Sequence, residues 1–371
     1  QLVAIGDLFQ DRIDGVKARF RQMGPEKCDL PDDRCFVGFD AYQKVIECCD
    51  LVLLATPPGF RPAHIKAAVD AGKHVFAEKP VAVDPAGAKL VMEAGEIAAR
   101  KGLGFVAGTQ RRHQAGYIQT ISRIHDGAIG QVVAGQCYWN TGSRWMKPRL
   151  ESWTDAEWQI RNWLYFTWLS GDHICEQHIH QIDVMNWIMG GPPASAYGMG
   201  GRQWRTDPAY GHIFDHFCIE YVYPNGARVM SMCRQIAGSA GRVGESVTGT
   251  KGTSSPGGSI KLFDGSDVRI ETRKGGLGAY QQEHVDLVNS IRAGKPLNEA
   301  RQVAESTLTA IMGRMSAYSG RVVTWDDAMK SRLDLMPEKI DFGPLPLPAV
   351  ARGCEPLDFT GWPKAASAKK G

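Results

Sequence analysis

The sequence has no long apolar run and no cluster of basic residues. None of its hydrophobic stretches approaches the roughly 20 residues that cross a bilayer, and no block of Lys or Arg exceeds a few residues. The 43 basic and 40 acidic residues leave a net charge of only +3. A chain with this balance is not expected to bind nucleic acid or an anionic membrane surface.

The cysteines lack the spacing of a redox or zinc motif. The nine cysteines are scattered and odd in number, no Cys-x-x-Cys occurs, and the one close pair is Cys48-Cys49. This pattern favours free thiols over a disulfide framework. Free thiols do not fix the compartment, so cytoplasmic and exported locations both stay open.

The order of the expected elements indicates two domains, as the length of 371 residues suggests for domains of about 150 residues each. Short apolar strands alternate with helices over residues 1–117, which predicts a parallel α/β sheet. The apolar run over residues 50–55 is typical of a strand buried on both faces. Residues 118–330 carry antiparallel hairpin signals, which predict an α+β domain with an open, mainly antiparallel sheet. Residues 331–371 are expected to form an extended tail.

Residues 171–187 carry the most suggestive polar pattern. Read at helical period, they place His173, Glu176, His180 and Asp183 on one face at spacings of three and four. Glu176 and His180 lie one turn apart, the spacing at which a carboxylate can orient an imidazole that moves protons. The alternative is an amphipathic helix with a solvated polar face.

This polar face lacks basic residues. None occurs between Arg161 and Arg202, whereas a solvated face usually carries Lys and Arg, so the pattern favours the wall of a cleft. A second alternative is a zinc site made by His173, Glu176 and His180. The sequence lacks the tighter His-Glu-x-x-His spacing, and we predict no metal.

Two loops at the ends of expected strands suggest a nucleotide site. Asp7 ends the first strand that this sequence contains. In dinucleotide-binding sheets an acidic side chain at the end of the second strand accepts hydrogen bonds from ribose hydroxyls and repels a 2′-phosphate, which favours NAD over NADP. A helix N-cap is the alternative role. Thr56-Pro57-Pro58 follows the apolar strand, where ligands bind in open α/β sheets, although a plain turn fits equally well.

The run Glu78-Lys79-Pro80 comes directly after another apolar strand, at the same edge of the expected sheet. Its lysine is either a solvated loop residue or a cation directed into the ligand crevice. Pro80 restricts the backbone there.

Aromatic residues gather ahead of the polar helix. Six of the ten Trp lie between Trp139 and Trp168, and flat aromatic faces suit a carbohydrate cleft, with core packing or a subunit interface as the alternative. Arg161, Trp163 and Tyr165 are the best candidates for substrate contacts. A further candidate group follows later in the chain: His212, Asp215 and His216.

Together these runs are similar to the glucose–fructose oxidoreductase / inositol dehydrogenase / MocA (Gfo/Idh/MocA) family. The resemblance extends to about Trp325 and rests on four segments, namely Ala55-Thr56-Pro57-Pro58, Ala77-Glu78-Lys79-Pro80-Val81-Ala82, Gly108-Thr109-Gln110-Arg111-Arg112, and Glu176 and His180 ahead of Asp183. It implies a Rossmann domain followed by an open-sheet α+β domain. It also implies nicotinamide-dependent oxidoreduction of a sugar, polyol or glycoside, in homo-oligomers formed through the open sheet.

The resemblance also implies roles for individual residues. The catalytic set would be Lys79, Glu176 and His180. Cofactor contacts would come from Asp7, Thr56, Pro57, Pro58, His64, Glu78, Lys79 and Gln110. Substrate contacts would come from Arg111, Arg161, Trp163, Tyr165, His173 and Asp183. The chain departs from the family pattern in carrying Glu176 where Asp is common and His178 where a small residue is common.

The family begins with a strand and a Gly-x-Gly-x-x-Gly turn, and this sequence has neither before Asp7. In the Rossmann order that strand lies at the centre of the sheet. Without it the strands ending at Asp7 and Ala55 lose their shared neighbour, so their backbone groups must pair with each other or stay unsatisfied. We expect the sequence to be part of a longer protein with about 30 or more preceding residues.

The function expected from the sequence is NAD-dependent oxidation and reduction of a CH–OH group. His180, held by Glu176, would take the hydroxyl proton, while Lys79 would bind the same oxygen and lower the pKa of His180. One alternative is a redox-neutral glycosidase that uses NAD transiently. Another is a sugar-binding protein without catalytic activity.

Overall fold

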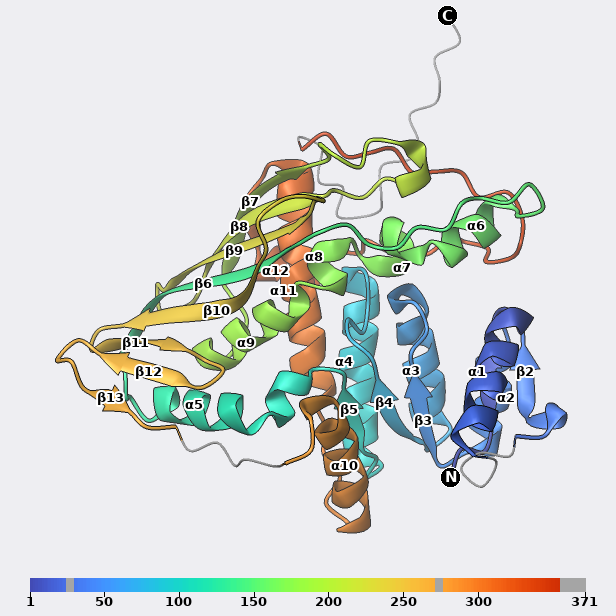
Figure 1. Ribbon diagram of the computed structural model, residues 1–371, viewed down its shortest axis with the longest axis horizontal. Helices are drawn as coiled ribbons and strands as arrows, with labels where there is room; N and C mark the ends of the chain where they lie inside the picture. Colours follow the sequence, from blue (N-terminus) through green and yellow to red (C-terminus); the bar gives the residue numbers. More distant parts are fainter. Residues whose placement is uncertain (25–29, 271–275, 354–371) are drawn as a thin grey trace, which may run out of the picture.

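The computed structural model describes residues 1–24, 30–270 and 276–353 (Figure 1). The first half contains short strands and helices in alternation: β1 (Ile5–Asp7), α1 (Gln10–Met23), β2 (Cys35–Val37), α2 (Ala41–Cys48), β3 (Leu51–Leu54), α3 (Arg61–Asp70), β4 (His74–Ala77), α4 (Pro85–Arg100), β5 (Phe105–Ala107) and α5 (Ala115–His125). The helix α5 spans the predicted boundary between residues 117 and 118, and the division of the chain at that residue stays a prediction.

The second half is built on one large sheet. Its strands are β6 (Val132–Thr141), β7 (Ser195–Gly201), β8 (His216–Val222), β9 (Arg228–Gln235), β10 (Arg242–Gly249), β11 (Gly252–Ser255), β12 (Ser259–Leu262), β13 (Asp267–Val268) and β14 (Val323–Thr324). Their order is β13-β12-β11-β10-β6-β9-β8-β7-β14, with every pair antiparallel except β6 and β9. The helices are α6 (Asp155–Arg161), α7 (Thr167–Ser170), α8 (His173–Glu176), α9 (Ile179–Met189), α10 (Ala279–Arg292), α11 (Ala300–Ser319) and α12 (Trp325–Lys330). The predicted fold class, a Rossmann-type parallel sheet and a mainly antiparallel sheet, is confirmed.

The parallel strands form two separate sheets. β1 pairs with β2, and β3, β4 and β5 pair in that order, but β1 and β3 are not hydrogen-bonded to each other within the described residues. A groove of about 1250 Å³ lies between them and is lined by both strands. The expected burial of the β3 strand on both faces is therefore wrong, because Leu53 faces the groove and is 57% exposed.

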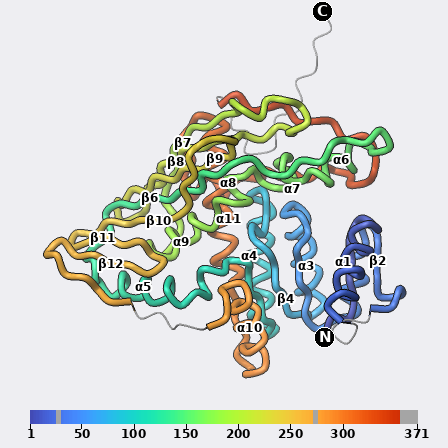
Figure 2. The backbone as a smooth tube through the Cα atoms, viewed as in Figure 1, coloured from blue at the N-terminus to red at the C-terminus, as the bar shows by residue number. Residues whose placement is uncertain are grey.

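The helix α11 joins the two halves of the molecule. It runs between the parallel strands and the large sheet (Figures 1 and 2), and all but a few of its residues are buried. Ala300, Val303 and Ala304 pack into the core around β3, β4 and β5. Leu308 and Ile311, further along, pack into the core under the large sheet.

Residues 331–353 contain no helix or strand and lie across both halves. The rest of the predicted tail, residues 354–371, lies outside the described residues, and the tail as a separate unit stays a prediction. Leu335 donates its backbone N–H to Asp84 at 2.8 Å. The ring of Phe342 lies 5.8 Å from that of Phe9 and 5.0 Å from that of Phe39. The tail therefore connects the β1–β2 unit with the rest of the molecule.

No helix among the described residues has the length and apolar character that crossing a membrane requires.

Replacing Ile311 by Ala is expected to lower the free energy of unfolding by about 2–5 kcal/mol, because the substitution leaves a cavity at a side chain with no exposed surface. Ile118→Ala, on the exposed face of α5, is the matched control and should cost much less, since that side chain is 43% exposed. Urea unfolding of the two variants measures the difference. Equal losses would contradict the role of α11 as the shared core.

Candidate active site

The polar stretch over residues 171–187 forms two short helices, and the prediction of one continuous helix is wrong. α8 ends at Glu176 and α9 begins at Ile179. The two intervening side chains are held elsewhere in the fold. His178 is fully buried with its Nε2 2.7 Å from Ser231 Oγ, and Gln177 is held by hydrogen bonds to other elements. Tertiary contacts thus outweigh the helical periodicity.

Lys79 and Glu176 bring the two halves of the molecule together. Lys79 follows β4 in the parallel sheet, and its Nζ lies 2.5 Å from the backbone oxygen of Glu176 and 3.4 Å from Oε1 of the same residue. Both side chains are nearly buried, with 12% and 13% of their surface exposed. The ion pair is therefore formed where little water screens it.

His180 is the second residue of α9 and is 9% exposed. Its ring centroid is 5.8 Å from that of Trp139, on β6. Burial and the nearby cations Lys79 and Arg111 hold the pKa of His180 well below its ordinary value of 6.5. The imidazole is therefore neutral at pH 7 and able to accept a proton.

The predicted contact between Glu176 and His180 is absent from the hydrogen bonds of the described residues. Glu176 faces Lys79 instead, and its Oε2 is buried without a hydrogen-bond partner. The break at Gln177 removes the one-turn geometry on which that contact depended.

A second ion pair borders His180. Arg111 forms an ion pair with Glu245 on β10, and Tyr117 donates its hydroxyl to the same carboxylate at 3.0 Å. The Arg111 side chain is 14% exposed and the Glu245 side chain 2%. Arg111 is thus one of the predicted substrate residues that the structure places near His180.

Two other predicted substrate residues are buried. His173 has no exposed surface, and its Nδ1 lies 3.0 Å from Asp172. Asp183 accepts hydrogen bonds from Arg112 at 2.9–3.1 Å and from Ser306 at 2.8 Å. Asp183 is therefore satisfied by the protein itself, whereas Nε2 of His173 is buried without a hydrogen-bond partner.

Asp172 is a residue that the sequence pattern did not single out. It has a positive φ of 72°, which is costly for a residue with a side chain. Its carboxylate is fully buried and accepts hydrogen bonds from the backbone of Phe214 and from Tyr318. These contacts fix the entry into α8, and the sequence carries no signal for them because the partners are distant in the chain.

Zinc binding, the alternative for the histidines, has no geometric support. No three His, Cys, Asp or Glu side chains lie close enough together to hold a metal ion in the part of the chain that the structure describes.

The predicted cofactor residues divide into two groups. Asp7, Thr56, Pro57 and His64 line the groove between β1 and β3. The ring of His64 stacks at 4.0 Å on Tyr42, and burial with nearby Arg61 lowers its pKa to about 4. The groove therefore offers an acidic acceptor and a neutral aromatic wall.

Pro58, Glu78 and Gln110 lie outside the lining of that groove. Glu78 lies against Gly108, where an added Cβ would approach its Oε2 to 2.4 Å. Gln110 donates its side-chain amide to Tyr280 at 3.1 Å. Gln110 thus contacts α10, whereas Glu78 packs against the loop after β5.

The substrate contacts predicted from the aromatic-rich segment lie in different parts of the structure. Arg161 and Trp163 line the groove rather than the surroundings of His180, and Arg161 pairs with Asp11 and Glu157. Tyr165 is buried and donates to the backbone oxygen of Trp145 at 2.8 Å. Of the six clustered tryptophans, Trp139 is the one whose ring contacts His180.

The later candidate group, His212, Asp215 and His216, is hydrogen-bonded to nearby protein groups. Thr167 Oγ1 lies 2.8 Å from Nε2 of His212. Asp215 accepts backbone N–H groups from residues 203–205 and lies 2.8 Å from His216 Nδ1. Both arrangements order the loop ahead of β8.

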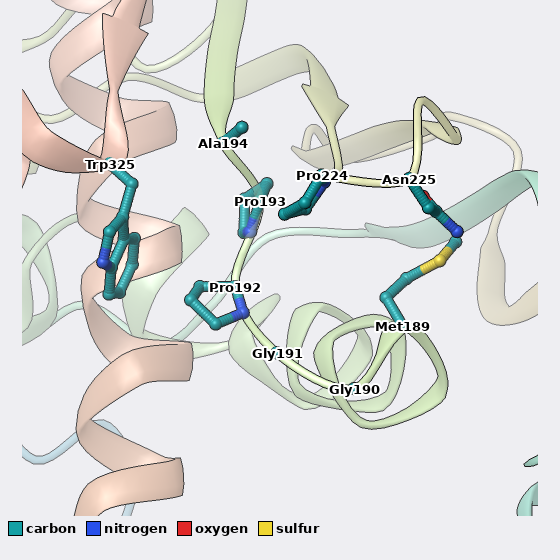
Figure 3. Close-up of a pocket in the computed structure, with 9 residues that line it drawn as sticks. All are labelled: Met189, Gly190, Gly191, Pro192, Pro193, Ala194, Pro224, Asn225 and Trp325. Carbon is teal, nitrogen blue, oxygen red and sulfur yellow. The ribbon is translucent and has the colours of Figure 1, made fainter.

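A smaller hollow of about 420 Å³ lies at the far end of α9 (Figure 3). Pro192, Pro193, Pro224 and Trp325 line it, and its lining holds no titratable side chain. At 1.5 Å per residue it is about 14 Å along the helix from His180, so it is separate from the site.

Family models match both halves of the chain. Residues 16–107 match an oxidoreductase family with an NAD-binding Rossmann fold, and residues 117–255 match the GFO/IDH/MocA C-terminal domain. The chain belongs to the Gfo/Idh/MocA family. The predicted family is thereby confirmed, and the predicted cofactor, NAD, agrees with the description of the family.

Individual members of the Gfo/Idh/MocA family have low sequence identity to this chain. The inositol 2-dehydrogenase/D-chiro-inositol 3-dehydrogenase of Halalkalibacterium halodurans is 30% identical over 190 residues, which are 51% of this chain and 45% of that protein. The 2,7-anhydro-N-acetylneuraminate hydratase of Escherichia coli is 26% identical over 183 residues, 49% of this chain and 44% of that protein. The chain thus matches about half the length of these relatives.

Solved structures share the fold. The aldose-aldose oxidoreductase from Caulobacter crescentus superposes with a TM-score of 0.67 and 20% identity, covering 87% of this chain and 91% of that one. An oxidoreductase domain protein from Kribbella flavida gives 0.68 and 18%, covering 87% and 90%. At this identity the likeness shows the fold alone.

The described residues of this Gfo/Idh/MocA chain fit the adenosine part of NAD. Asp7 lies at the carboxyl end of β1 inside the groove, where its carboxylate can accept hydrogen bonds from ribose hydroxyls. Burial raises the pKa of Asp7, because the groove partly removes water from the carboxylate and so disfavours its charged form. Thr56 and Pro57 follow β3, which lines the same groove, and continue its wall.

Replacing Lys79 by Met is expected to raise the pKa of His180. The substitution removes a cation that disfavours the imidazolium and leaves the negative charge of Glu176 in place. NMR titration of the histidine rings measures the shift. Lys66→Met, at an exposed ion pair on α3, should leave His180 unchanged, and an unchanged or lower pKa in Lys79→Met would contradict the assignment.

Proposed function

We propose that this protein is an NAD-dependent oxidoreductase that moves hydride between the CH–OH group of a sugar or polyol and nicotinamide. The observation that carries the proposal is the meeting of Lys79, from the parallel sheet, with Glu176 beside His180 on the large-sheet side. The sugar and polyol enzymes among the matches support the substrate class.

In the proposed reaction the chain handles the proton of the substrate hydroxyl. Neutral His180 accepts that proton, while the ammonium of Lys79 donates a hydrogen bond to the same oxygen and stabilises the negative charge that develops on it. Glu176 positions Lys79 by its ion pair, a role different from the orientation of His180 predicted from spacing. The bound nicotinamide supplies the acceptor for the hydride.

The balance of the reaction follows from these roles. The carbinol C–H bond breaks, and its hydrogen and electron pair leave together as hydride for the nicotinamide. The O–H bond breaks, and its proton passes to Nδ1 or Nε2 of His180. The carbon thereby becomes a carbonyl. Because burial and two cations disfavour the imidazolium, the proton is released readily to solvent after the step.

The preference for NAD over NADP rests on Asp7. Its carboxylate lies where the adenosine ribose would bind, so a 2′-phosphate would meet a negative charge.

We also propose a homo-oligomer formed through the large sheet. Tyr197 and Met199 on β7 are 54% and 66% exposed, and as residues i and i+2 of one strand they lie on the same face of the sheet. Apolar side chains on one open sheet are typical of a buried interface.

Replacing His180 by Asn is expected to lower turnover by about 10²–10⁴-fold, the usual contribution of a positioned acid–base group. NADH affinity, measured by nicotinamide fluorescence, should stay within a few-fold, because His180 does not line the groove. The assay follows NADH formation and aglycone release from inositols, hexoses and aryl glycosides.

His125→Asn, at an imidazole near the surface end of α5, is the matched control and should retain turnover. Equal activity in His180→Asn would remove the proposed role of His180. Aglycone release without net NADH would instead indicate the redox-neutral glycosidase, and sugar binding without turnover the non-catalytic protein.

A further inference from the structure

The charges around His180 are compensated, with one exception. Lys79 is paired with Glu176, and Arg111 with Glu245. Arg144, in the loop after β6, is the exception, since no carboxylate lies within ion-pair distance of it in the described parts of the chain.

Arg144 is held beside the site by neutral groups. Its Nε donates to Gln177 Oε1 at 3.1 Å, and its Nη2 donates to Thr141 Oγ1 at 3.2 Å. Tyr165 fixes the loop by donating to the backbone oxygen of Arg144 at 3.2 Å. The guanidinium is therefore positioned, but its charge is not neutralised.

Gln177 connects Arg144 with the proposed catalytic group. This residue lies between Glu176 and His180 at the break of the two helices, and its Oε1 also accepts from Trp139 Nε1 at 3.0 Å. The ring of Trp139 is the one that contacts His180. Gln235 Nε2 donates to the same oxygen at 2.5 Å, so the amide cannot turn away without losing three donors.

The guanidinium has donors left for a ligand. Of its five N–H groups, two are used by Gln177 and Thr141, and Nη1 makes no hydrogen bond within the described residues. Nη1 and the second hydrogen of Nη2 therefore remain for a ligand, and a guanidinium can bind a carboxylate through two parallel N–H groups.

We propose that Arg144 selects substrates that carry a carboxylate, so that the preferred substrate is a sugar acid or a polyol acid rather than a neutral sugar. This inference rests on the proposed oxidoreductase function and names its substrate class. A single carboxylate matches the one uncompensated positive charge, whereas a phosphate dianion would leave an excess negative charge in a partly buried site.

Steady-state kinetics with matched pairs tests the proposal. Glucose is compared with glucuronate and gluconate, galactose with galacturonate, and glucose 6-phosphate provides the phosphate arm. The unchanged protein should show a higher kcat/KM for the carboxylates than for either other class. Arg144→Met should lower kcat/KM for the carboxylates by about 10- to 100-fold, mainly through KM, as expected for charged hydrogen bonds, and leave the neutral sugars within a few-fold.

Arg149→Met is the matched control on the same loop. Arg149 is paired with Asp155 and contacts the ring of Trp158, so its loss should leave the ratio of acid to neutral substrate unchanged. Arg144→Lys retains the charge without the planar fork and should recover part of the preference. Equal kcat/KM for acids and neutral sugars, a preference for the phosphate, or equal losses for both classes in Arg144→Met would overturn the proposal.

Binding without cofactor separates this inference from the proposed function. Titration of tryptophan fluorescence with glucuronate and glucose, in the absence of nicotinamide, should show tighter binding of the acid that is lost in Arg144→Met. If no substrate of any class is oxidised but this difference remains, the oxidoreductase function fails and the carboxylate site stands. If oxidation occurs and the difference is absent, the carboxylate site fails and the oxidoreductase function stands.

Discussion

The buried helix α11 is the constraint on which both halves of the site depend. Its apolar residues complete the cores on either side, and its polar residues hold the loops that carry the chemistry. Thr307 accepts the backbone N–H of Val81, just after Lys79, at 3.4 Å. Tyr318 donates to Asp172 at the entry of α8, and Arg314 donates to the oxygen of Gly171. One rigid element thus sets the distance between Lys79 and Glu176.

The second organising feature is the balance of charge in a poorly solvated region. Positive charge lowers the pKa of His180, but the cations that do so are themselves held by Glu176 and Glu245. Buried charges are tolerated only when they are paired and hydrogen-bonded. The uncompensated Arg144 stands out against this background, because its nearest partners are neutral oxygens.

The division of the parallel strands shapes the cofactor side. β1 and β3 flank a groove whose walls include exposed apolar side chains such as Leu53. Asp7 and His64 lie along the same groove. Within the described residues β1 and β3 do not pair with each other, and the groove separates the two parallel sheets.

The sequence by itself was sufficient for the alternation of strands and helices, which follows local periodicity, and for the family, which rests on short runs such as Glu78-Lys79-Pro80. The grouping of Lys79 with Glu176 and His180 was implied by the family resemblance. The sequence also predicted one continuous helix through His173 and Asp183, which is wrong. Only the tertiary structure decided that Gln177 and His178 leave the helix, that Glu176 contacts Lys79 instead of His180, and that the partners of Arg144 among the described residues are neutral. The physical reason is that each of these depends on partners 33 to 97 residues away, whose contact energies outweigh helical spacing and leave no trace in the local pattern.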